Sequence, residues 1–216
     1  MAKDSSRQSQ LRLLVAQQAA RMMAEDGVSD YAYAKRKAGR QLGILDVSCM
    51  PTNSEIEEEI KLFHEIYNAD EQPEALRQLR NDALIVMKML ERFNPHLTGS
   101  VLDGTAGKYA ETNIHLFADS LKDVEMFLLS QQVPYDTDEK AYRTTNDRRN
   151  TERKGGDRKK VPVFTLEGPN GIIKLSVFDI DDMRTRTKSP ANGNTANKVN
   201  AESLRALIES AKSSVE

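Results

Sequence analysis

Apolar side chains recur every three or four positions along most of the chain and every second position in several short segments. The first spacing is typical of helices that bury one face, and the second is typical of strands in a half-buried sheet. The helical spacing predicts helices at about residues 6–25, 30–42, 54–67, 73–93, 121–131 and 201–212. The alternating spacing predicts a strand that ends near residue 99, a strand over 113–119, a strand that begins at 133, and strands over 161–166 and 172–178.

The order of these segments predicts an α+β fold, in which a mixed β-sheet is packed with helices and preceded by a helical region. Residues 1–70 carry only helical patterns, whereas residues 71–216 alternate between helical and strand patterns. A strand–helix–strand unit of this length suits a mixed sheet with helices on at least one side. We therefore expect an N-terminal helical region over 1–70 and an α/β domain over 71–216.

Turn residues predict where several of these elements begin and end. Asp30 or the residue before it is a suitable N-cap for the second helix, and Gly43 is suited to end that helix. Asn53 or Ser54 is the predicted cap of the third helix, and the segment 168–171, Gly-Pro-Asn-Gly, is the predicted hairpin turn between the last two strands.

Composition excludes several classes of protein. The chain has 216 residues, of which 38% are hydrophobic and 30% charged, and its formal net charge of −2 provides no global attraction for nucleic acid. Cys49 is the single cysteine, which excludes an intramolecular disulfide and a zinc site built from cysteine clusters. No apolar run approaches the length needed to cross a bilayer, and the N-terminus lacks the apolar region of a signal peptide. We expect a cytoplasmic protein that does not bind membranes.

The most informative stretch runs from Leu97 to Asp119. Gly99 and Gly104 permit backbone conformations and close approaches that a Cβ atom would block, and Ser100 offers a hydroxyl and an N–H group to an anion. In the strand that follows, the alternation places Ile114, Leu116 and Ala118 on one face and Asn113, His115 and Phe117 on the other.

This layout resembles the nucleotidyltransferase superfamily, whose signature is a Gly-Ser turn, a further glycine, and Asp-x-Asp on the next strand. It also resembles a group of bacterial proteins with the same arrangement. The resemblance covers about a quarter to a third of the chain and implies a nucleotidyltransferase-like sheet. It also implies that Gly99, Ser100 and Gly104 hold nucleotide phosphates, with Mg²⁺ as the cofactor.

The resemblance places Asn113 and His115 where the family carries its two metal-binding aspartates. Neither is a carboxylate, whereas Mg²⁺ prefers oxygen ligands and usually takes one or two carboxylates. A later strand supplies the general base in the family; here Asp179 is the nearest acid, just beyond that strand. The catalytic candidates implied are therefore Asn113, His115 and Asp179, and no metal ligand is assigned.

Residues 140–160 have the most unusual composition, with nine basic residues against three acidic ones. We expect a flexible loop that is either simply solvated or binds nucleotide or RNA phosphates, with a salt-dependent affinity. Its candidate phosphate-binding residues are Arg148, Arg149, Arg153 and Lys154.

The sequence is compatible with three functions. The first is a nucleotidyltransferase-fold protein that binds nucleotide or RNA phosphates with weak or lost catalysis. The second is an active Mg²⁺-dependent enzyme that moves a nucleotide from a nucleoside triphosphate to an acceptor, through metal ions that stabilise the attacking and leaving oxygens. The third is an interaction module whose N-terminal helices bind a partner protein or a second copy of the chain.

Overall fold

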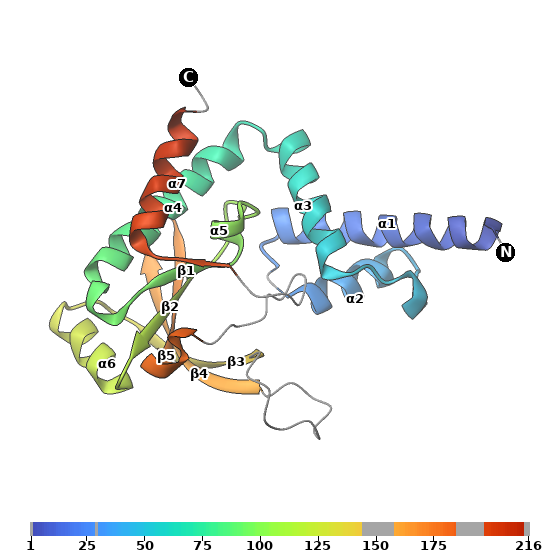
Figure 1. The fold of residues 1–216 in the computed structure, drawn as a ribbon. Helices are drawn as coiled ribbons and strands as arrows, with labels where there is room; N and C mark the ends of the chain where they lie inside the picture. The colour runs from blue at the N-terminus through green and yellow to red at the C-terminus, as the bar shows by residue number, and fades with distance from the viewer. Residues whose placement is uncertain (1, 29, 144–157, 185–196, 214–216) are drawn as a thin grey trace. The chain divides into compact units, whose positions relative to one another are not determined.

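The structure is a computed structural model that describes residues 2–28, 30–143, 158–184 and 197–213. It has an α+β fold: helices precede and flank a six-stranded mixed sheet, as the sequence predicted (Figure 1). By their contacts the described residues form two compact units. The first comprises the chain up to Leu76 together with Gly104–Ala110, and the second comprises Arg77–Asp103 and the described chain from Glu111 onward.

The first unit is built from helices that share one apolar core. Its core consists of small and branched side chains, among them Val15, Ala19, Ala34, Ile56 and Ile60. The elements are α1 (Ala2–Glu25), α2 (Tyr31–Gln41), the 3-10 helix η1 (Val47–Cys49), α3 (Asn53–Tyr67) and the start of α4 (Glu71–Met89).

Local sequence explains how two of these helices begin. The Asp30 side chain accepts a hydrogen bond from the Tyr33 backbone N–H at 2.8 Å, so the predicted cap of α2 is confirmed. The predicted cap of α3 is wrong by one or two residues: Thr52 is the N-cap, and Thr52 and Glu55 form a reciprocal capping box. That box satisfies two backbone N–H groups at once.

The second unit contains the whole sheet, whose strand order is β3-β4-β5-β2-β1-β6. β2 and β5 are parallel, and the other neighbouring pairs are antiparallel. The strands are β1 (His96–Thr98), β2 (Thr112–Ala118), β3 (Asp136–Arg143), β4 (Arg158–Gly168), β5 (Gly171–Asp179) and β6 (Lys198–Val199). The unit also holds the rest of α4, η2 (Glu91–Phe93), α5 (Ser100–Asp103), α6 (Leu121–Ser130), η3 (Ile180–Arg184) and α7 (Ala201–Ser213).

Several boundaries in this unit differ from the sequence prediction. The predicted strand at residue 133 begins instead at Asp136, and α4 stops at Met89, where a short 3-10 helix replaces its last predicted turn. The stretch 140–160 is not a loop throughout, because Lys140–Arg143 lie in β3 and Arg158–Lys160 lie in β4. Antiparallel pairing extends the hairpin into basic sequence, since backbone hydrogen bonds do not depend on side-chain charge.

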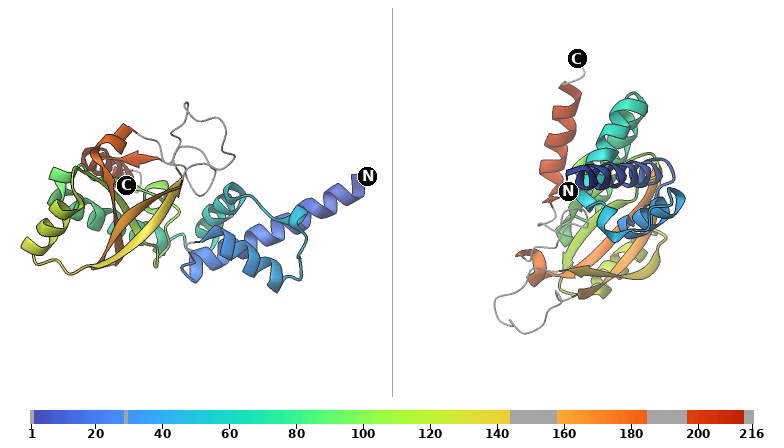
Figure 2. Two further views of the ribbon diagram at one scale, coloured as in Figure 1. Left: turned by 90° about the horizontal axis from the view of Figure 1, so that it is seen from below. Right: turned by 90° about the vertical axis from the view of Figure 1, so that its right-hand side faces the viewer.

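The two faces of the sheet differ in polarity. α4, α6 and α7 lie on one side of it (Figures 1 and 2), and they bury Leu79, Val124 and Leu204. The strand side chains of the apolar face form a row across four strands: Leu97, Ile114, Leu175 and Phe164, each at most 3% exposed. Burial of such side chains is the main favourable term in folding, so this face forms the core of the unit.

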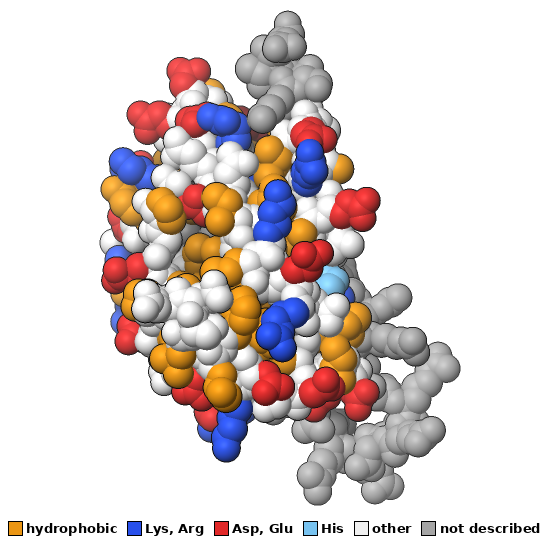
Figure 3. Space-filling view, turned by 90° about the vertical axis from the view of Figure 1, so that its left-hand side faces the viewer, with side chains coloured by type: hydrophobic (Ala, Val, Ile, Leu, Met, Phe, Trp, Pro, Cys, Tyr) orange, Lys and Arg blue, Asp and Glu red, His pale blue; other side chains and the backbone are white. Residues whose placement is uncertain are grey.

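Apolar side chains also remain on the outer surface of the helices. Ile85 of α4 and Met126 and Leu129 of α6 are each at least 60% exposed. Figure 3 views the molecule from this side and shows hydrophobic side chains interspersed with charged ones. Among the described helices, none has both the length and the apolar character required to span a membrane.

Candidate functional site

A row of polar side chains crosses the sheet on the face opposite the apolar row. The strand registers place one polar residue from each of five adjacent strands, β4, β5, β2, β1 and β6, side by side. In that order they are Thr165, Lys174, Asn113, Thr98 and Lys198. Polar groups in a half-buried position cost free energy unless they are paired, so such a row is not explained by packing alone. We therefore take this polar face as the candidate site.

An ion pair lies at the centre of the polar face. The Lys174 ammonium is 2.7 Å from Oε1 of Glu111, the residue directly before β2. The two side chains are 29% and 27% exposed, so solvent screens the pair only in part. Glu111 is two residues from Asn113 and therefore projects to the same face. The alternating pattern of 113–119 did not reveal it, because Glu111 lies outside the strand.

A second lysine, Lys140 of β3, projects from the same face of the sheet. Lys140 pairs with Val161 in the register, and its ammonium lies 5.5 Å from the centre of the Tyr142 ring. Burial lowers the pKa of Lys140, the positive charge of Lys174 lowers it further, and the carboxylate of Glu111 acts in the opposite direction. Among the described residues no carboxylate forms an ion pair with Lys140. The Lys174–Glu111 ion pair and the Lys140 ammonium thus belong to the same face of the sheet.

His115 belongs to the polar face but is buried, with 3% of its surface exposed. Its ring contacts Phe178 and Tyr142, with centroid distances of 4.6 and 5.2 Å. Burial lowers the pKa of His115 to about 3, with smaller contributions from the charges of Lys140 and Lys198. The imidazole is therefore neutral at physiological pH and packs as an aromatic ring beside cations.

Asn113 has little freedom to meet a ligand. Its Nδ2 donates a hydrogen bond to the backbone carbonyl of Glu111 at 3.2 Å. Its Oδ1 is sealed from solvent and has no hydrogen-bond partner among the described residues. A buried acceptor without a partner is unfavourable, which marks Asn113 as a residue that packing alone does not explain.

The Gly-Ser turn follows β1 directly, as predicted. β1 and β2 are antiparallel neighbours, with Leu97 opposite Ile114 and Thr98 opposite Asn113. Gly99 has φ +79°, in the left-handed region that favours glycine. Ser100 begins the short helix α5, whose Val101 and Leu102 carbonyls accept hydrogen bonds from the Arg80 guanidinium at 3.0 and 3.1 Å.

Gly104 and Asp179 are not brought to the polar face. Gly104 has φ +81° and belongs to the first unit, where its carbonyl accepts a hydrogen bond from Gln72 at 3.1 Å. Asp179 pairs with Ala118, whose side chain projects to the opposite face, and its Oδ1 accepts a hydrogen bond from the Asp181 backbone N–H at 3.1 Å. Its position thus favours a local capping role. The predicted phosphate-binding residues of the basic segment lie outside the described residues: Arg148, Arg149, Arg153 and Lys154.

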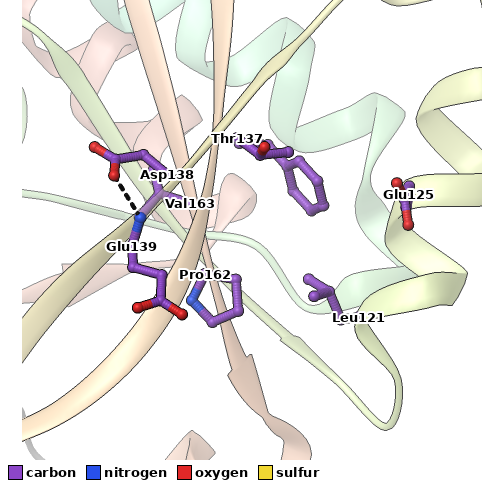
Figure 4. A pocket seen from close by; sticks show the side chains of 8 residues that line it. Leu121, Glu125, Thr137, Asp138, Glu139, Pro162 and Val163 are labelled. Atoms are coloured by element: carbon purple, nitrogen blue, oxygen red, sulfur yellow. Dashed lines mark hydrogen bonds between the residues drawn. The ribbon is translucent and has the colours of Figure 1, made fainter.

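A separate hollow of about 460 Å³ lies between α6 and the β3–β4 hairpin (Figure 4). Leu121 and Glu125 line it from α6, and Pro162 and Phe164 line it from β4. Phe164 belongs to the apolar row, so this hollow opens away from the polar face. The lining combines apolar side chains with dispersed acidic groups and provides no convergent set of polar groups.

Comparisons with models of protein families, with curated proteins and with solved structures give no match for this chain. Within the described ranges there is also no group of three or more His, Cys, Asp or Glu side chains arranged to hold a metal ion. The polar face itself is therefore the source of any inference about function.

Proposed function

We propose that this protein binds the phosphate groups of a nucleotide on the polar face of its sheet, with weak or lost catalysis. The observation that carries the proposal is the Lys174–Glu111 ion pair at 2.7 Å, on a face of the sheet that also carries Lys140. Two like charges held close together destabilise each other unless an anion neutralises them. A phosphate group supplies that negative charge together with several acceptor oxygens.

The rest of the polar face supports a phosphate ligand. Lysine acts as a mobile point charge with three donors, and it is a frequent phosphate-binding residue. Thr98 and Gly99 lie at the end of β1 beside Asn113, where the resemblance to nucleotidyltransferases implies that the phosphates are held. The phosphates of RNA share this chemistry, so nucleotides and RNA are tested as separate ligands.

The test measures the melting temperature of the full-length protein at low salt with ATP, GTP, CTP or UTP, and separately with a short single-stranded RNA. A ligand that binds the folded state raises the melting temperature by mass action. We expect stabilisation by at least one nucleotide, a loss of the effect as salt rises, and a loss in both Lys140→Gln and Lys174→Gln.

The matched control is Lys122→Gln, which changes an exposed lysine of α6 outside the polar face. This variant should respond to the nucleotide like the wild type. The absence of stabilisation by every nucleotide would overturn the proposal, and binding of RNA without binding of any nucleotide would overturn the choice of ligand.

A further inference from the structure

We infer that the polar face binds phosphate through lysine ammonium groups in the place where a nucleotidyltransferase would hold divalent metal ions. This inference rests on the proposed function and makes it more specific. It predicts a ligand that carries at least two negative charges, such as a nucleoside di- or triphosphate, bound without a bridging cation.

The available oxygen donors do not fit a divalent ion. Mg²⁺ requires near-octahedral oxygen ligation and usually takes one or two carboxylates. Glu111 is the carboxylate nearest to Asn113 in the chain on this face, and its Oε1 is already 2.7 Å from the Lys174 ammonium. The Oδ1 atom of Asn113 is sealed from solvent, so it could ligate a metal only after the side chain had moved.

His115 and the charges of Lys140 and Lys174 do not fit a divalent ion either. His115 is 3% exposed and its ring packs against the rings of Phe178 and Tyr142. Lys174 lies beside Asn113 in the register and Lys140 projects from the same face, so two positive charges disfavour a divalent cation there. The same two charges favour a phosphate dianion.

Glu111 then has a definite role as a positioning residue. Glu111 directly precedes β2, and its carboxylate forms an ion pair with the Lys174 ammonium of β5. This pair offsets part of the lysine charge while no ligand is bound. An incoming phosphate competes with this carboxylate for Lys174. Removal of the Glu111 charge should therefore strengthen phosphate binding, whereas removal of a metal ligand would weaken it.

The experiment is isothermal titration calorimetry of the full-length protein with ATP and with inorganic tripolyphosphate, in EDTA and in excess Mg²⁺. We expect both probes to bind in EDTA, and Mg²⁺ to weaken binding because it reduces the charge of the probe. Glu111→Gln should tighten binding by about threefold, since a competing charge is removed. Lys174→Gln and Lys140→Gln should each weaken binding by about tenfold, the effect of losing one charged hydrogen bond.

Two failures can be distinguished. Binding that requires Mg²⁺ and is lost in Glu111→Gln would overturn this inference and leave the proposed function intact. No binding of either probe in either buffer would overturn the proposed function itself. Far-UV circular dichroism and the melting temperature establish that each variant is folded, and Lys140→Gln keeps the test decisive if Lys174→Gln does not fold.

Discussion

The side chain of Asn113 lies beside Gly99 across the β1–β2 pair. A Cβ atom at Gly99 would lie 3.8 Å from Nδ2 of Asn113, which is an ordinary van der Waals contact. Space therefore does not require glycine at this position. The φ angle of +79° does, because L-residues with a Cβ atom rarely adopt it.

Gly99→Ala should therefore lower the free energy of unfolding by about 1–2 kcal/mol, the cost of a left-handed conformation for a residue with a Cβ atom. Gly99→Asn should cost less, because asparagine tolerates this conformation better than alanine. Urea denaturation measures both effects. If the turn also positions phosphates, Gly99→Ala should weaken nucleotide binding as well.

Gly43 provides a matched control for this prediction. It has φ +68°, and a Cβ atom there would meet nothing within 4 Å. Gly43 belongs to the first unit, so Gly43→Ala should cost a similar free energy without changing nucleotide affinity. Equal losses of affinity in the two variants would mean that Gly99 acts only through stability.

Because His115 is buried in its neutral form, we predict that the protein loses stability as the pH falls. The pKa is about 3 in the folded protein, because burial and nearby lysines disfavour the charged ring, and the ordinary value is 6.5. The unfolded chain therefore takes up a proton first as the pH falls. The contribution of His115 to stability is complete above about pH 6.5 and is lost progressively toward pH 3, by about 1.4 kcal/mol per pH unit.

Chemical denaturation of wild type and His115→Gln between pH 8 and pH 5 measures this effect. The wild type should lose more stability on acidification than the variant, and the difference between the two slopes isolates His115 from His64 and His96. In NMR spectra the ring signals of His115 should stay in the neutral form down to pH 5. A titration of this ring near pH 6 would contradict the buried environment.

The carboxylate of Asp82 in α4 binds the turn between β4 and β5, so its removal should destabilise the fold. Oδ2 of Asp82 accepts hydrogen bonds from the backbone N–H and the side-chain Nδ2 of Asn170, at 3.2 and 2.9 Å. Asp82 is 9% exposed and Asn170 is exposed, so the substitution removes two hydrogen bonds to a charged acceptor. Asp82→Ala should lower the free energy of unfolding by about 1–3 kcal/mol.

A double-mutant cycle with Asn170→Ala tests whether this loss comes from the contact itself. If it does, the double variant should be more stable than the sum of the two single losses predicts. Strict additivity in urea denaturation would show that Asp82 and Asn170 contribute independently.

The elements that the sequence predicted well are those whose signals are local. The hairpin turn at residues 168–171 joins β4 to β5, where Gly168 pairs with Gly171, and the strand over 113–119 is β2 to within a residue. The two strands around the Gly-Ser turn, β1 and β2, are antiparallel neighbours. Element ends were predicted less well, as at Thr52 and Asp136, because they depend on which nearby group satisfies a backbone N–H or C=O group.

The candidate site was predicted only in part, because its partners are far apart in the chain. Glu111 and Lys174 have no shared local pattern, and the ion pair between them exists because β2 and β5 are parallel neighbours. Lys140 belonged by composition to a basic loop, and only its pairing with Val161 places it in β3, on the polar face.

The fold class, most of the helices and strands, and the turn at Gly99 follow from local sequence, because hydrophobic spacing and glycine act within a few residues. The tertiary structure decided which polar side chains meet: it buried His115, set Asp179 on the opposite face, and joined Lys140, Lys174 and Glu111 on one surface. The physical reason is that strand register, a long-range property, assigns every side chain to one face of the sheet or the other.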